Sequence, residues 1–100
     1  MPITLINTLQ NKNEAPVICT ETVDIKEALF VEKGHFYLMA YNGETFVLID
    51  YFNRGFRSEI SKHDLQYFKV VTQEQFDVYE ECCNEGNTNR ISEIVKEILS

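Results

Sequence analysis

The chain has 100 residues, 44% hydrophobic and 12% aromatic, so residues 1–100 suit one domain with its own core, which excludes wholesale disorder. The net charge of −7 is uneven, because residues 72–100 hold seven acids against two bases, whereas residues 1–71 hold nine acids against seven bases. Since Lys and Arg must displace counterions from phosphates, this balance argues against direct binding to nucleic acid or to an anionic membrane, and it fits either a basic protein partner or an ordinary acidic surface.

The first segments of the chain have weak patterns. Residues 3–9 are predicted to be a short strand or a frayed arm, and residues 11–14 a turn or loop. Branched residues then favour a strand over residues 17–23. The charged stretch 24–33 is expected to be a connection, with four apolar anchors: Ile25, Leu29, Phe30 and Val31.

The strongest local signal is Asn42-Gly43 between two apolar runs, residues 35–41 and 45–51. Asn and Gly tolerate the positive φ angles that a tight type I′ turn needs at both of its central residues. The sequence therefore predicts a β-hairpin closed by a type I′ turn.

Three further elements follow the hairpin. Asn53-Arg54-Gly55 predicts a turn into a third antiparallel strand over residues 56–60. Residues 61–65 are predicted to form one helical turn, and residues 66–71 a last strand. Together with the strand over residues 17–23 this makes five short strands, and closing them into a barrel would protect the sheet edges that a flat meander leaves unpaired.

Both faces of the predicted hairpin are apolar, so one core cannot cover them. Along the strands, inward and outward positions alternate, yet both sets are hydrophobic. The second face needs a cover, which is either the C-terminal helices or a surface for a homodimer or another protein. The two sets in the first strand are Phe36, Leu38, Ala40 and Tyr37, Met39, Tyr41, and those in the second are Phe46, Leu48 and Val47, Ile49, Tyr51.

Residues 72–100 change to helical periodicity and are expected to form a helical hairpin. Thr72 and Gln75 predict a capping box, and Gly86 predicts the end of the first helix. A second helix is expected from Thr88. The first helix has an apolar stripe of Phe76, Tyr79 and Cys83, and the second has one of Ile91, Ile94, Val95, Ile98 and Leu99.

Several of these features occur together in one known family. Gly34-His35-Phe36-Tyr37 leads into the hairpin, and Ser61-Lys62-His63-Asp64-Leu65 precedes Phe68-Lys69-Val70-Val71. With these elements, the segment from Val17 to Val71 resembles the small Src-homology-3-like barrel domains of short bacterial and phage proteins. The resemblance implies an α+β fold: a small antiparallel five-stranded β-barrel followed by two C-terminal helices.

The chain departs from the peptide-binding members of that family. Ala28-Leu29-Phe30 matches only the beginning of their Ala-Leu-Tyr-Asp-Tyr signature, and Val31-Glu32 follows it. The chain also has no Trp on which a polyproline ligand could pack. Recognition of proline-rich segments is therefore not expected.

The residues that usually carry chemistry do not form a recognisable active site. His35 and His63 lack metal-ligand spacing to any Cys or to each other, so we expect no metal, cofactor or catalytic residue. Cys19, Cys82 and Cys83 are interpreted as reduced, small hydrophobic residues. An enzyme remains an alternative that a deep polar pocket around either histidine would support.

The leading hypothesis is therefore a non-enzymatic protein-binding module in the cytoplasm, because no membrane segment or export signal is apparent. The alternative is a small acidic inhibitor or immunity-type protein, encoded by a phage or mobile element. It would block a nucleic-acid-handling enzyme by placing carboxylates where phosphates bind. The predicted partner-binding residues are Tyr51, Phe52, Phe56, Glu74, Asp77, Glu80, Glu81 and Glu85.

Overall fold

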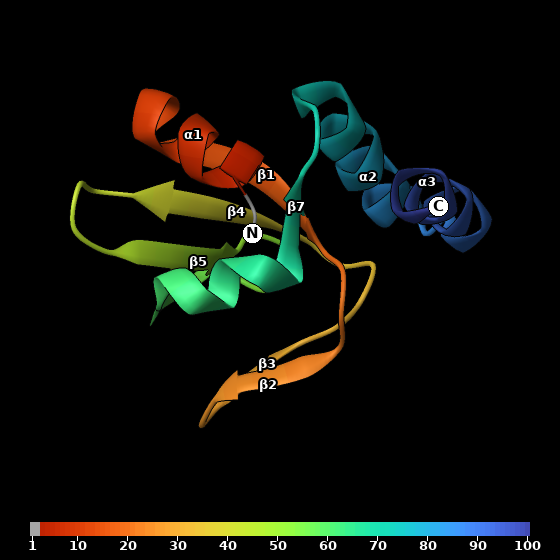
Figure 1. The fold of residues 1–100 in the computed structure, drawn as a ribbon. Coiled ribbons are helices and arrows are strands. Elements are labelled where there is room, and N and C mark those ends of the chain that lie inside the picture. Colours follow the sequence, from red (N-terminus) through yellow and green to blue (C-terminus); the bar gives the residue numbers. More distant parts are fainter. Residues whose placement is uncertain (1–2) are drawn as a thin grey trace.

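Residues 3–100, which the computed structural model describes, have an α+β fold built on a five-stranded antiparallel sheet (Figure 1). An N-terminal helix precedes the sheet, and two helices follow it. In chain order the elements are α1 (Ile3–Lys12), β1 (Glu14–Cys19), β2 (Val23–Lys26), β3 (Leu29–Val31), β4 (Phe36–Tyr41), β5 (Phe46–Asp50), β6 (Phe56–Ile60), the 3-10 helix η1 (Lys62–Tyr67), β7 (Phe68–Val70), α2 (Gln73–Glu85) and α3 (Thr88–Leu99).

The strand order in the sheet is β6-β5-β4-β1-β7, with antiparallel neighbours throughout. The five strands predicted from the sequence are confirmed as β1, β4, β5, β6 and β7. The predicted helical turn before the last strand is confirmed as η1. β6 and β7 are the two edge strands, and no pairing joins them within residues 3–100.

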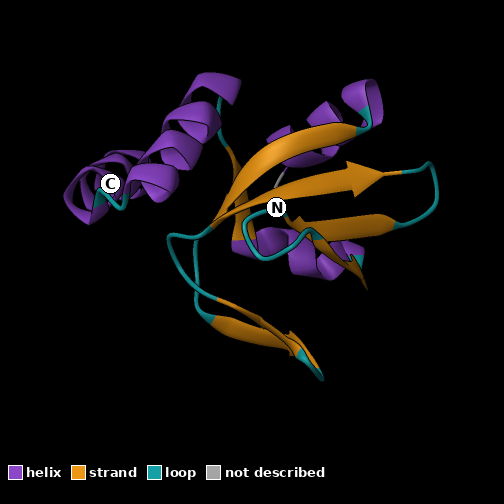
Figure 2. Ribbon diagram, turned by 180° about the vertical axis from the view of Figure 1, so that it is seen from behind, coloured by secondary structure: helices purple, strands orange, loops and turns teal. Residues whose placement is uncertain are grey.

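The prediction for residues 17–33 was wrong in two details. The first strand ends at Cys19, because there the chain leaves the sheet to pair with the turn before β4: the Cys19 carbonyl accepts from Gly34 N at 2.9 Å. The expected connection instead contains the two-stranded hairpin β2-β3, with a register shift between Asp24 and Lys26 and a positive φ of 64° at Ala28. Figure 2 shows this hairpin projecting away from the main sheet.

The prediction of a strand or frayed arm over residues 3–9 was also wrong, because this segment belongs to helix α1. Leu5 and Leu9 are one helical turn apart and are only 1% and 0% exposed. They pack into the core between α1 and the sheet. Burial against strands that are distant in sequence therefore stabilises a helix that the local pattern did not predict.

The hairpin of β4 and β5 is confirmed, but its predicted turn type was wrong. The last strand pair is Tyr41 with Phe46, so four residues form the loop. Gly43 has a φ of 96°, whereas Asn42 is not in the positive region that type I′ requires. Instead, Asn42 Oδ1 accepts hydrogen bonds from the backbone N–H of Glu44 at 2.9 Å and of Thr45 at 2.8 Å.

The predicted termini of the C-terminal helices are confirmed. Thr72 and Gln75 form a reciprocal capping box, and Gly86 ends α2 in the left-handed conformation with a φ of 70°. Cys82 is buried and Cys83 is exposed, so the predicted stripe ending on Cys83 was wrong by one residue. None of the helices in the described part of the chain is both long and apolar enough to cross a membrane.

Apolar residues on the two faces of the sheet form two separate clusters. The inner core lies between the sheet, α1 and the β2-β3 hairpin, and the outer core lies between the sheet and the C-terminal helices. The inner core contains Leu5, Leu9, Ala15, Val17, Cys19, Val31, Tyr37, Met39, Leu48, Ile60, Leu65 and Phe68. The outer core contains Ile18, Phe36, Val71, Phe76, Tyr79 and Ile98.

Through the outer core, the C-terminal helices cover the second face of the β4-β5 hairpin. The ring of Phe36 in β4 stacks on that of Tyr79 in α2, with centroids 4.1 Å apart. From α3, Ile98 is buried and the rest of its apolar stripe is partly buried against the same cluster. The prediction that the C-terminal helices cover the second face of the hairpin is thus confirmed at Phe36.

Candidate functional site

The structure places the predicted partner-binding residues in two separate regions. Tyr51 and Phe52 lie beside α2: the ring centroid of Phe52 is 5.3 Å from that of Phe76 and 5.0 Å from that of Tyr79. Phe52 is half-buried there and not exposed as expected, and its role as a contact residue stays a prediction. Phe56 is 61% exposed and lies instead at the start of β6, beside the β2-β3 hairpin.

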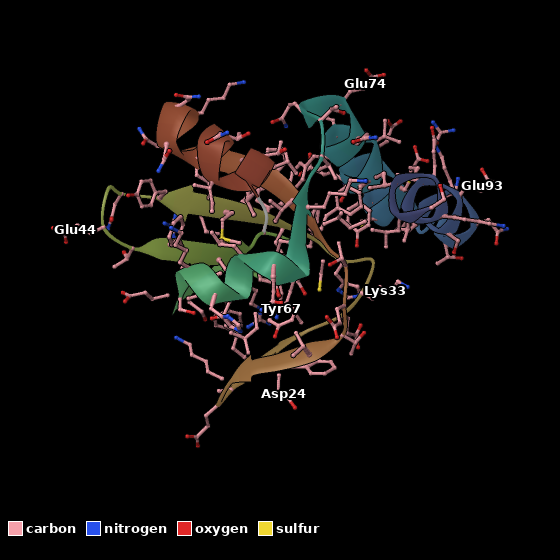
Figure 3. All side chains as sticks on the ribbon, viewed as in Figure 1. Asp24, Lys33, Glu44, Tyr67, Glu74 and Glu93 are labelled. Carbon is pink, nitrogen blue, oxygen red and sulfur yellow. The ribbon has the colours of Figure 1, made fainter. Side chains whose placement is uncertain are left out.

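The predicted acidic residues all lie on α2, and all except Glu80 are on the side away from the outer core. Glu74, Asp77, Glu81 and Glu85 are exposed at helical spacing, and none forms an ion pair within residues 3–100. Figure 3 shows Glu74 pointing outward from the helical pair, far from Asp24 on the β2-β3 hairpin. The acidic face and Phe56 therefore cannot belong to one small contact site.

Glu80 differs from the other acids because it is half-buried and lies next to Tyr51. The pKa of the Tyr51 hydroxyl is raised, first by hydrogen bonding to the Glu80 carboxylate and then by its negative charge. This residue pair links the β5-β6 turn to α2, which makes it part of the packing between the sheet and the helical pair.

A surface recess lies between the β2-β3 hairpin and β6, and we call it the aromatic recess. Its volume is about 310 Å³, near the lower end for small-ligand pockets. Phe30 and Phe56 border it and are 54% and 61% exposed. The full lining is Ala28, Leu29, Phe30, Tyr37, Leu48, Asp50, Asn53, Phe56, Arg57 and Ser58.

The β5-β6 turn positions Phe56 at this recess. The Asp50 carbonyl accepts from Asn53 N at 3.0 Å and from Gly55 N at 2.9 Å. Gly55 has a φ of 67°, which glycine adopts without the strain that a side chain brings. The tight turn pairs Phe56 with Asp50 at the beginning of β6, so the Phe56 ring stands directly at the border of the recess.

The opposite wall comes from β3, where sequence reasoning treated Phe30 only as an apolar anchor. Val31 is fully buried, and side chains alternate along a strand, so Phe30 points to the other side. That alternation is the signal that could have identified Phe30 as an exposed residue. Its position opposite Phe56 depends on how the hairpin folds over the sheet.

The chemistry of the aromatic recess suits an apolar side chain with polar neighbours. Tyr37 and Leu48 are buried and contribute apolar surface, while Asp50 and Arg57 supply one charge of each sign. Burial is the main cause that raises the pKa of Tyr37 to about 12, and the charge of Asp50 adds to it. The Tyr37 hydroxyl is therefore neutral at physiological pH and is suited to hydrogen bonding.

Two other recesses lack exposed aromatic rings. One of about 440 Å³ lies between α1, the β4-β5 loop and the end of β6, and includes Gln10, Glu44 and Lys62 in its lining. The other, of about 280 Å³, lies between α2 and α3, with Val78 and Ile94 between Glu74 and Glu97.

Neither a histidine nor a cysteine lines any of the three recesses. His35 Nε2 is 3.0 Å from a Glu32 carboxylate oxygen on the surface. Burial raises the pKa of the Cys19 thiol, and partial desolvation by its neighbours raises that of the exposed Cys83 thiol, which disfavours the reactive thiolate at both. Within residues 3–100, no three His, Cys, Asp or Glu side chains are grouped so that they could hold a metal ion.

Comparison of the chain with models of protein families, with curated proteins and with solved structures finds no match. The features that bear on function are therefore the geometry of the aromatic recess and the acidic face of α2.

Proposed function

We propose that the chain is a non-enzymatic protein-binding module whose contact surface is the aromatic recess. The observation that carries this proposal is the placement of exposed hydrophobic rings. Within residues 4–100, the exposed large hydrophobic residues are Phe30, Phe56 and Tyr51, and the first two border the same recess. Grouped exposed aromatic residues are typical of protein-interaction surfaces, since they exclude water when a partner covers them.

We also propose that the sheet is a small Src-homology-3-like barrel. Three features support this assignment: the strand order β6-β5-β4-β1-β7, the hairpin β2-β3 inserted between β1 and β4, and η1 immediately before β7. The aromatic recess is formed by the inserted hairpin and by β5 and β6.

Binding would place a bulky apolar side chain of the partner between Phe30 and Phe56. Burying such a side chain contributes about 1.5 to 3 kcal/mol, which favours one or two anchor residues over a broad flat contact. Asp50 would orient the partner through a hydrogen bond at the border of the recess.

Selection from a random-peptide display library against the full chain tests this function. We expect peptides with an apolar or aromatic anchor to be enriched on the wild type and lost on the double variant Phe30→Ser/Phe56→Ser. Tyr51→Ser is the matched control, because it removes the third exposed ring outside the recess. Equal binding of the selected peptides to the wild type and to the double variant, or no enriched peptide at all, would refute the proposal.

A second candidate function is the acidic inhibitor of a nucleic-acid-handling enzyme. It is favoured by the exposed row of Glu74, Asp77, Glu81 and Glu85, which present carboxylates along one face of α2 without ion pairs in the described part of the chain. Carboxylates at this spacing could occupy a phosphate-binding groove of another protein.

The heparin-binding fraction of a bacterial extract, assayed for nuclease and polymerase activity, tests this second function. An activity inhibited by the wild type, but not by a variant with the four acids changed to amides, supports it. The inhibition should weaken between about 50 and 200 mM salt, because the contact is electrostatic. Inhibition that does not change with salt concentration would argue against this second function.

A further inference from the structure

Among the described residues 3–100, no strand pairs with the edge of β6 that lies beside the aromatic recess. Strand β6 pairs with β5 on one side only, and its other side faces the β2-β3 hairpin. We propose that a partner protein adds an extended strand antiparallel to β6, with a basic, an apolar and an acidic residue opposite Glu59, Ser58 and Arg57. This inference rests on the proposed function and specifies how the recess is used and what sequence the partner carries.

The backbone of β6 is available for such pairing. The Glu59 carbonyl accepts a hydrogen bond from Nζ of Lys26, a residue at the end of β2. This carbonyl therefore points away from β5 and into the space beside the hairpin. The ammonium group of the exposed Lys26 occupies the place that a backbone N–H of an added strand would take. Lys26 can move aside, because its side chain is long and exposed and water can replace its hydrogen bond to the Glu59 carbonyl.

The register of the sheet decides where the added side chains would point. Ser58 pairs with Leu48, and both residues line the aromatic recess. A partner residue opposite Ser58 lies on the same face, so its side chain enters the recess. Ser58 itself is small and leaves that space open for an apolar side chain.

The two neighbours of Ser58 supply the charge complementarity. Arg57 and Glu59 are exposed and point to the other face of β6 from Ser58. An antiparallel partner strand runs from Glu59 to Arg57, opposite to the direction of β6. Its residues from N- to C-terminus are therefore basic (opposite Glu59), apolar (opposite Ser58) and acidic (opposite Arg57). Each opposite-charge pair across strands favours the correct partner by roughly 1.4- to 5-fold.

A second copy of this chain would supply the complementary charges but no apolar side chain to fill the recess. If β6 paired with β6 of another copy around Ser58, each Arg57 would face a Glu59. However, the residue entering each recess would then be Ser58, which cannot fill an apolar space between Phe30 and Phe56. The recess therefore favours a different protein with an apolar residue at this position.

Parallel peptide selections against two forms of the full chain test the inference. One form is the wild type, and the other is the double variant Arg57→Glu/Glu59→Arg, which exchanges the two charges and keeps the composition. We expect basic-apolar-acidic peptides on the wild type and acidic-apolar-basic peptides on the variant. For a peptide and its charge-reversed counterpart, the two pairs together give an affinity ratio of roughly 2 to 25, inverted between the two forms.

Backbone pairing is tested on the best wild-type peptide by N-methylation. Methylating the residue opposite Glu59 blocks the hydrogen bond to its carbonyl, and we expect at least a fivefold loss of affinity, corresponding to about 1 kcal/mol. Methylating the apolar residue opposite Ser58 is the matched control, because its N–H points away from β6 in an antiparallel ladder. Equal losses at both positions would contradict strand addition.

The outcomes separate this inference from the proposed function. If no selected peptide depends on Phe30 and Phe56, the proposed function fails and the inference fails with it. If peptides depend on these residues but both charge forms select the same sequences, only the inference is overturned. A dimer in light scattering that Arg57→Glu dissociates would also overturn it, since β6 would then bind a second copy.

Discussion

The inner and outer cores of this protein lie on opposite faces of one sheet and are built differently. The inner core is mainly aliphatic and is enclosed by several elements, and Leu9, Val17, Met39 and Leu65 are each 0% exposed. Three of the six buried residues of the outer core are aromatic, and half-buried residues of α3 surround them. Many elements share the first core, whereas the second depends on α2 and α3 remaining in place.

The helical pair is held to the sheet by few contacts. Phe36 stacks on Tyr79, and Lys69 Nζ of β7 donates to the carbonyl of Ile98 near the end of α3 at 2.9 Å. Regions with fewer buried contacts open at lower free energy than the global unit. We therefore expect α2 and α3 to open without unfolding of the inner core, and the following predictions test that difference.

Phe36→Ala should have the largest effect, a loss of about 3 to 5 kcal/mol of unfolding free energy, because it removes the ring between the sheet and α2. Hydrogen exchange should show a greater loss of amide protection in α2 and α3 than in β1, β4 and β5. Phe36→Leu is the control, since it keeps most of the buried volume. Equal loss of protection in sheet and helices would show that the two cores unfold as one.

Leu48→Ala should lower the unfolding free energy by about 2 to 5 kcal/mol, because Leu48 is 1% exposed in the inner core. Denaturant unfolding gives the magnitude. Unlike Phe36→Ala, this variant should reduce protection in every element, including α2 and α3, since they lose the sheet on which they pack. Retained protection of the helical pair would contradict this dependence.

Thr72→Ala should cost about 0.5 to 2 kcal/mol, because the Thr72 hydroxyl accepts from Gln75 N at 3.0 Å in the capping box of α2. The loss should appear first as faster exchange in the first turn of α2. Thr72→Ser keeps the hydroxyl and should leave the unfolding free energy within a few tenths of a kcal/mol of the wild type. A destabilised serine variant would mean that the methyl group, and not the cap, matters.

A pH titration compares one buried tyrosine from each core. Burial raises the pKa of Tyr37 to about 12 and also raises the pKa of Tyr79. An unfolded tyrosine has a pKa of about 10. Each therefore contributes stability that is complete below pH 10 and is lost as the pH rises toward the folded value, because the unfolded state ionises first.

Denaturant unfolding between pH 9 and 12 measures this loss, with Tyr37→Phe and Tyr79→Phe as the two test variants. Above about pH 10, the unfolding free energy of each variant should decrease less with rising pH than that of the wild type. If water is excluded from both tyrosine side chains, both variants should weaken the pH dependence of the unfolding free energy. A pH dependence unchanged by both would contradict the raised pKa values.

Features that depend on near neighbours were predicted well from the sequence. The capping box of Thr72 and Gln75 and the ending of α2 at Gly86 involve backbone groups a few residues away. The hairpin at Asn42-Gly43 was also predicted, although its four-residue loop was not. In that loop the Asn42 side chain replaces the backbone geometry that a type I′ turn would need.

Features that depend on distant contacts were missed. Helix α1 has a weak pattern of its own, and its two leucines are buried only because the sheet provides the opposite surface. Half of the candidate site was missed for the same reason. Phe56 was predicted as a contact residue, but Phe30 was not, since the two meet only when the β2-β3 hairpin lies beside β6.

The sequence by itself determined the strand and helix segments with strong local patterns, the acidic C-terminal part, and the need to cover two apolar faces of one hairpin. Periodicity, turn residues and charge are properties of neighbouring positions, so they can be read without a fold. Only the tertiary structure decided which face α2 and α3 cover and which aromatic rings stay exposed. Burial is a property of the whole chain, because a side chain is hidden only when residues far along the sequence pack over it.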